Sequence, residues 1–164
     1  MKLTVSELLE SVCEEYGEER EVSYDGYWRI SYKVLRDESR ALAASLQEMG
    51  IRKKDKIAVC LPNWNEFLII YMAIAHVGAI IVPFNTRYRT EEVEYILRNS
   101  EAKMAFFTNE FSGVNHMEQF TEAQKKVSTL EHLVTVRYQA GELLNYSDLV
   151  EKGKELEYKP VNIN

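Results

Sequence analysis

Glycine is scarce and scattered in this chain. It accounts for 7 of the 164 residues, and no two glycines fall within a stretch such as GxGxxG or GxxxxGK. A loop that grips a nucleotide phosphate needs closely spaced glycines, because only residues without a side chain let several backbone N–H groups crowd around the anion. The sequence therefore excludes a phosphate-binding loop of this kind from its own residues.

Cysteine and histidine are equally rare. The two cysteines, Cys13 and Cys60, each sit in an apolar pattern, and the three histidines have no second histidine or cysteine at the spacing of a metal site. No GxSxG segment accompanies the serines. We therefore expect no disulfide, no metal site and no catalytic nucleophile in this chain.

Positive charge is in deficit, with 20 Lys and Arg against 26 Asp and Glu and a net charge of −6. Such a chain repels a polyanion, which excludes nucleic acid as a partner. The longest apolar run, Phe67–Val82, is shorter than the ~20 residues of a membrane helix, so we expect a buried helix followed by a buried strand instead. The polar residues Ser6, Glu7 and Glu10 leave no room for a secretory signal, which predicts a cytoplasmic protein.

Helix and strand patterns alternate along the chain. Apolar residues at helical spacing predict helices, and short continuous apolar runs predict strands that are covered on both faces. The expected helices span 3–16, 32–49 and 64–77, with a further one from Thr90, a weaker one over 110–127 and a short turn at 147–150. The expected strands span 56–61, 79–82, 103–107 and 133–136.

This order predicts an α/β fold in which a parallel sheet is flanked by helices. The Asp25–Gly26 pair predicts a turn, and therefore a small β-hairpin near residues 22–31. Residues 1–150 are expected to form one domain. Residues 151–164 carry charges and Pro160 but no apolar period, so we expect a linker there.

The segment Asn85–Arg89 is the strongest candidate for a binding site. It follows the carboxyl end of a predicted parallel strand, where open α/β sheets bind ligands. Its two arginines, Arg87 and Arg89, offer planar guanidinium groups that suit a phosphate. A solvated loop before a helix explains the same residues, and both interpretations stay open at this point.

Several segments together resemble the adenylate-forming superfamily. Ile30–Leu35 (ISYKVL) is similar to its first conserved block, written as leucine, serine or threonine, tyrosine, two variable residues and leucine, with Ile30 as a departure. Leu61–Asn63 and Ala73–Asn85 (AIAHVGAIIVPFN) are similar to the segments that follow in acyl-CoA ligases. The resemblance covers about residues 3–150, and fatty acyl-CoA ligases are the nearest branch.

The resemblance implies an ATP-dependent reaction in which a carboxylic acid, such as a fatty acid, becomes an acyl-adenylate and then an acyl-CoA. ATP, Mg²⁺ and coenzyme A are the implied cofactors of the complete enzyme. The family's Ser/Thr/Gly/Lys loop is expected after Asn164, so this chain alone should be inactive. In some coenzyme A ligases an arginine equivalent to Arg87 lies near the nucleotide phosphate of coenzyme A, which makes Arg87 the one implied cofactor contact.

Two other functions remain open from the sequence. The chain could be a free-standing, non-catalytic α/β module for interaction or dimerisation that derives from the family. It could also be a small nucleotide-binding domain of flavodoxin-like shape, although the lack of a glycine loop argues against that. A parallel sheet without its remaining layers leaves apolar surface uncovered, so we expect self-association of the isolated chain.

Overall fold

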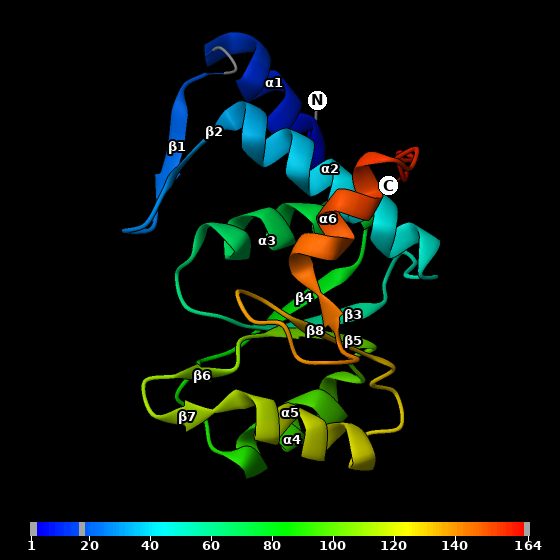
Figure 1. Cartoon of the computed structure of the whole chain (residues 1–164). Coiled ribbons are helices and arrows are strands. Elements are labelled where there is room, and N and C mark those ends of the chain that lie inside the picture. The colour runs from blue at the N-terminus through cyan, green and yellow to red at the C-terminus, as the bar shows by residue number, and fades with distance from the viewer. Residues whose placement is uncertain (1–2, 17–18, 163–164) are drawn as a thin grey trace. The chain divides into compact units, whose positions relative to one another are not determined.

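A computed structural model describes residues 3–16 and 19–162 (Figure 1). Contacts divide the chain into two compact units. The first, which we call the helical unit, comprises Met1–Lys53, Asn63–Ala79 and Leu149–Asn164. The second, which we call the sheet unit, comprises Lys54–Pro62 and Ile80–Asp148.

The sheet unit is built on five parallel strands in the order β4-β3-β5-β8-β9. The strands are β3 (Lys56–Cys60), β4 (Ile80–Pro83), β5 (Met104–Phe107), β8 (His132–Thr135) and β9 (Leu144–Asn145). All residues of β5, and all of β3 except Lys56, are buried, as their continuous apolar sequences require. The predicted parallel sheet is therefore confirmed.

Two helices cover one face of this sheet. Figure 1 shows α4 (Thr90–Ser100) and α5 (His116–Lys126) side by side below the strands. Their inward side chains share one core with the strands. Its largest members include Phe107, Phe120, Leu97 and Leu133. The prediction of a sheet flanked by helices is confirmed, and the apolar face of each helix explains where it packs.

Strand β4 differs from the buried strand that we expected, because it forms an edge of the sheet. Ile80 is 47% exposed. The N–H of Ile80 donates to the carbonyl of Asp55, and the N–H of Phe84 donates to the carbonyl of Val59 in β3. Because successive N–H groups of a strand point to opposite sides, the nitrogen of Pro83 faces away from β3. Proline has no N–H to donate, which suits it to an outer edge. The apolar sequence of β4 had suggested cover on both faces.

The helical unit contains α1 (Val5–Tyr16), α2 (Tyr32–Glu48), α3 (Asn65–Val77) and a hairpin of β1 (Glu21–Tyr24) and β2 (Arg29–Ser31). The predicted hairpin is confirmed, and its turn has Gly26 at φ 93°. Ser31 begins α2 by accepting a hydrogen bond from the N–H of Val34. Gly50 ends it at φ 86°, and the N–H of Ile51 reaches back to the carbonyl of Leu46.

Helix α6 (Tyr146–Lys154) begins in the sheet unit and ends in the helical unit. In the helical unit it lies against α2, where the hydroxyl of Ser45 donates to the carbonyl of Leu149 at 2.5 Å. Beyond it, the side-chain amide of Gln47 bonds both the N–H and the carbonyl of Lys159. The helix thus runs past residue 150, where we placed the domain boundary; that boundary stays a prediction.

One predicted helix is partly wrong. Residues 110–115, which we assigned to a helix over 110–127, form a hairpin of β6 (Glu110–Phe111) and β7 (Val114–Asn115). Its two turn residues, Ser112 and Gly113, have φ of 52° and 78°, which a helix does not allow. Asn115 then caps α5 by accepting from the N–H of Glu118. Within residues 3–16 and 19–162, no helix has the length and apolar character to cross a membrane.

Candidate functional site

The loop between β4 and α4 lies at the carboxyl end of the parallel sheet, as the sequence predicted. Its residues Phe84–Arg89 follow the last residue of β4. Arg87 and Arg89 are exposed. Neither guanidinium group makes a hydrogen bond or an ion pair with the residues that the structure describes. Both cations are therefore available to an anion in solution.

The backbone of this loop is held by its own side chains. The side-chain oxygen of Asn85 accepts a hydrogen bond from the N–H of Arg87 at 2.9 Å, and the carbonyl of Asn85 accepts from the N–H of Tyr88 at 3.2 Å. The carboxylate of Glu92 accepts from the N–H of Arg89 at 2.8 Å. Arg87 thus projects from a turn whose backbone polar groups are satisfied on either side.

Helix α5 contacts the loop through a hydrogen bond and a pair of stacked rings. The amide nitrogen of Gln119 donates to the carbonyl of Tyr88 at 3.0 Å, and the amide oxygen of Gln119 lies 3.1 Å from Nδ1 of His116. The ring of Phe84 stacks on Phe120 with the centroids 6.0 Å apart. These residues bring α5 and the loop together although about 30 positions separate them in the sequence.

A depression of about 370 Å³ opens beside the loop. Its walls come from the loop, from the turn of the β6–β7 hairpin and from α5; they include Arg87, Arg89, Gly113, Asn115, Glu118 and Glu122. The guanidinium groups on one wall can bind a phosphate, whereas the two glutamates on the other wall repel it. A phosphate is therefore favoured against the loop wall.

The buried titratable groups that contact the loop do not provide an activated nucleophile. Burial raises the pKa of the Cys60 thiol to about 12. Burial also lowers the pKa of His116, and the hydrogen bond with Gln119 opposes this effect only in part. At neutral pH the thiol is therefore protonated and the imidazole is uncharged. A protonated thiol is a poor nucleophile, so Cys60 acts as a packing element, and the uncharged ring of His116 holds a hydrogen bond with Gln119.

The ligands that the family resemblance implies fit this chain unequally. Among the described residues, no group of three His, Cys, Asp or Glu side chains is placed to hold a metal ion. The sequence also lacks a glycine loop for the phosphates of ATP. The exposed arginines of the loop do suit a phosphate group. The described residues thus fit a phosphate group better than they fit Mg²⁺.

A second cavity, of about 740 Å³, lies in the helical unit. The end of α2 and residues 156–161 line it. The polar groups here bond the chain to itself, as Gln47 does with Lys159 and as the amine of Lys53 does with the carbonyl of Asn162. We therefore assign it no ligand.

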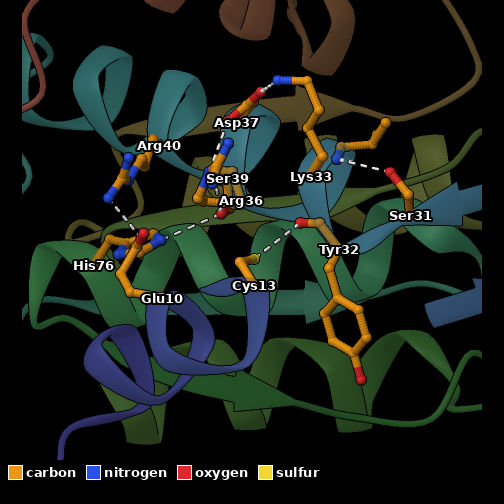
Figure 2. A network of polar contacts seen from close by, with 11 residues as sticks. Glu10, Cys13, Ser31, Tyr32, Lys33, Arg36, Asp37, Ser39, Arg40 and His76 are labelled. Atoms are coloured by element: carbon orange, nitrogen blue, oxygen red, sulfur yellow. Dashed lines mark hydrogen bonds and ion pairs between the residues drawn. The ribbon is translucent and has the colours of Figure 1, made fainter. Parts of the chain in front are cut away.

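The helical unit also contains a buried polar network around His76 (Figure 2). Figure 2 shows Ser39 of α2 facing His76 of α3, and the hydroxyl of Ser39 lies 3.2 Å from Nε2 of the ring. Beside them, Arg40 pairs with Glu10 of α1 at 2.6 Å. His76 is 2% exposed, and its Nδ1 has no hydrogen-bond partner among the described residues. Burial, followed by the nearby charge of Arg40, lowers the pKa of His76 to about 4.

This low pKa predicts a loss of stability in acid. The unfolded chain protonates His76 below about pH 6.5, whereas the folded chain keeps it neutral down to about pH 4. The contribution of neutral His76 to the free energy of unfolding is therefore fully present above pH 6.5. It is lost as the pH drops from 6.5 to 4, which lowers the free energy of unfolding by up to about 3 kcal/mol. Urea unfolding at pH 7.0 and pH 4.5 should show this loss. His76→Gln should remove much of the difference, and an unchanged pH dependence in that variant would contradict the assignment.

Comparison with known proteins shows which family and which solved structures the chain resembles. The sequence model of a family described as AMP-binding enzyme matches residues 9–162. Acyl-CoA ligase sidI of Aspergillus fumigatus is 28% identical over 95% of this chain, and 2,3-dihydroxybenzoate-AMP ligase of Bacillus subtilis is 30% identical over 89%. The crystal structure of the anthranilate CoA ligase AuaEII in complex with anthranoyl-AMP superposes on 98% of the chain with a TM-score of 0.82 and 20% identity.

These relatives are much longer than this chain. The matched region spans 28% of the Aspergillus ligase, 27% of the Bacillus ligase and 29% of the chain of AuaEII. The likeness to AuaEII supports the fold alone, because its sequence identity is low.

Proposed function

Because the chain belongs to the AMP-binding enzyme family, we propose that it forms the N-terminal part of an ATP-dependent acyl-CoA ligase. The proposed reaction has two steps. A carboxylate attacks the α-phosphorus of ATP and releases pyrophosphate, and the thiol of coenzyme A then attacks the acyl carbon and releases AMP. The match of the family over residues 9–162 is the observation that carries this proposal.

The names of the relatives support this reaction class. The Aspergillus relative is named as an acyl-CoA ligase. A carboxylic acid is therefore the proposed substrate, with a fatty acid as one candidate, and ATP, Mg²⁺ and coenzyme A are the proposed cofactors of the complete enzyme.

A second candidate follows from the Bacillus relative. It is named as an AMP ligase of 2,3-dihydroxybenzoate, an aromatic acid, with no mention of coenzyme A. The complete protein could accordingly adenylate an aromatic acid and use another acceptor. Turnover with a panel of fatty and aromatic acids, with and without coenzyme A, separates the two candidates.

Within this chain, we assign Arg87 to a nucleotide phosphate of coenzyme A. The exposed guanidinium group, its position at the carboxyl end of the sheet and the satisfied turn that carries it support this role. Arg89, on the same loop, adds positive charge nearby. Neither residue contacts the reacting atoms in this proposal; they hold one end of the cofactor.

We expect Arg87→Ala to weaken the binding of coenzyme A at least about tenfold, because a charge-assisted hydrogen bond contributes about 1.5–3 kcal/mol and each 1.4 kcal/mol is about tenfold. The measurement is the KM for coenzyme A in the full-length protein that contains this chain. Adenylation, measured as ATP–pyrophosphate exchange, should be unchanged. Arg98→Ala is a matched control, because Arg98 is an exposed arginine on α4 that pairs with Glu94 instead. An unchanged KM for coenzyme A would contradict the role proposed for Arg87.

The 164-residue chain by itself is proposed to be inactive. Incubation with ATP, Mg²⁺, coenzyme A and the same acids should release no AMP, and robust turnover would contradict this. A reading frame that continues past Asn164 into a Ser/Thr/Gly-rich loop with lysine supports the ligase. A stop codon there favours the non-catalytic module. The self-association of the isolated chain and its cytoplasmic location stay predictions.

A further inference from the structure

Three side chains of the sheet unit converge under the loop that carries Arg87. Gln119 and His116 come from the first turns of α5, and Cys60 is the last residue of β3. All three are at most 6% exposed. Their polar atoms point at one another and at two carbonyl groups of the loop, those of Asn85 and Tyr88.

The amide of Gln119 connects the helix to the loop. Its nitrogen donates to the carbonyl of Tyr88 at 3.0 Å. Its oxygen must then face Nδ1 of His116, 3.1 Å away, so this ring nitrogen carries the proton. His116 thereby fixes which way the amide of Gln119 is turned, and Gln119 fixes the tautomer of His116. This arrangement pairs both polar ends of the Gln119 amide, whereas the turned amide would place two donors or two acceptors against each other; Nε2 of His116 has no hydrogen-bond partner among the described residues.

The other side of the loop is fixed as well. Phe84 stacks on Phe120, one residue after Gln119 on α5. The thiol of Cys60 lies 4.0 Å from the carbonyl of Asn85, a weak contact that closes the space beneath it. The backbone is thus anchored both before and after Arg87, while the side chain of Arg87 stays in solvent.

We propose that Gln119, oriented by His116, is a positioning residue that presets the loop so that Arg87 meets a phosphate of coenzyme A. This inference rests on the proposed function of Arg87 and extends it to two buried residues that contact the loop. A guanidinium group on a fixed backbone loses less conformational freedom on binding than one on a mobile loop, and a displacement of about 1 Å weakens a charge-assisted hydrogen bond strongly. Gln119 acts through the backbone of Tyr88, next to Arg87.

The test is Gln119→Met in the full-length protein, because methionine keeps the length of the side chain and removes both hydrogen bonds. We expect the KM for coenzyme A to rise about fivefold to tenfold, with ATP–pyrophosphate exchange unchanged. The matched control is Gln124→Met. Gln124 lies on the same helix and also donates to backbone carbonyls, but those belong to Leu130 and Glu131, away from Arg87. This control should leave the KM for coenzyme A unchanged.

A double-mutant cycle with Arg87→Ala separates positioning from a general loss of structure. If Gln119 acts through Arg87, the double variant should bind coenzyme A no more weakly than Arg87→Ala alone. Fully additive losses, or equal losses in Gln119→Met and Gln124→Met, would overturn the positioning role.

The role of Arg87 and the role of Gln119 are contradicted by different results. If Arg87→Ala leaves the KM for coenzyme A unchanged, the function proposed for Arg87 is wrong, and the role of Gln119 is lost with it. If Arg87→Ala weakens binding and Gln119→Met does not, only the positioning role is wrong. A fall in ATP–pyrophosphate exchange in Gln119→Met that matches the loss in coenzyme A turnover would also overturn it, since that pattern indicates general damage to the fold.

Discussion

Gly153→Ala is expected to destabilise the protein by about 3 kcal/mol. A methyl group on Gly153 would lie 1.8 Å from the carbonyl oxygen of Ala41 and 2.4 Å from its carbon. Both atoms belong to the backbone of α2, so they cannot rotate away as a flexible side chain would. Relief requires α6 to move from α2, which also lengthens the hydrogen bond from Ser45 to Leu149.

Two effects of this substitution oppose each other. Alanine favours a helix over glycine by about 1 kcal/mol. Overpacking costs about 1–3 kcal/mol and sometimes more, and the hydrogen bond at Ser45 adds about 1 kcal/mol. The steric cost is therefore the larger, because the clash is with backbone.

Urea unfolding followed by the fluorescence of Trp28 and Trp64 measures the effect, since both indoles belong to the helical unit. Lys152→Ala, at the exposed neighbouring position of α6, is the control and should change the free energy of unfolding by less than about 0.5 kcal/mol. If Gly153→Ala is as stable as the parent chain, the close approach of α6 and α2 is wrong.

The sequence predicted the sheet well because the relevant signals are local. Apart from Lys56 at the start of β3, the strands β3 and β5 have no charged or strongly polar residue, and this alone indicates strands that are covered on both faces. Ser31 and Gly50 mark the two ends of α2 by backbone chemistry that needs no tertiary contact. Such features can be predicted from the sequence without knowledge of the fold.

The errors arose where a local pattern has two interpretations. Capping preferences favour Thr90 as the N-cap of α4, but Arg89 holds that position, and Glu92 supplies the hydrogen bond to its N–H. Ser112–Gly113 occurs within a stretch whose later residues are helical, so the hairpin before α5 was read as helix. Edge exposure of β4 depends on the order of strands in the sheet, which an apolar run does not encode.

The candidate site was predictable only in its exposed part. Arg87 follows a strand and carries a charge suited to phosphate, which the sequence displays directly. Gln119 and His116 gave no comparable signal, because a glutamine and a histidine at the start of a weak helix are ordinary residues. Their importance comes from the approach of α5 to a loop about 30 residues earlier, which is a tertiary contact.

Phe120→Ala is expected to have the largest effect in the sheet unit, a loss of about 4 kcal/mol. Phe120 is fully buried and stacks on Phe107 with the ring centroids 4.4 Å apart and on Phe84 at 6.0 Å. Removing a buried phenyl ring costs about 3–5 kcal/mol, because apolar contacts are lost and the cavity collapses only in part. Phe107 belongs to the buried strand β5, which limits that collapse, and the expected value lies in the middle of this range.

Far-UV circular dichroism during urea unfolding is the suitable probe for Phe120→Ala, because neither tryptophan belongs to the sheet unit. Phe120→Leu should lose only about 1–1.5 kcal/mol, since leucine refills most of the space. Tyr95→Ala, which removes an aromatic ring that is 65% exposed on α4, should change little. A Phe120→Ala variant no less stable than Tyr95→Ala would mean that α5 does not pack on the sheet through this ring. In that case Gln119, the preceding residue, would have no fixed helix from which to hold the loop of Arg87.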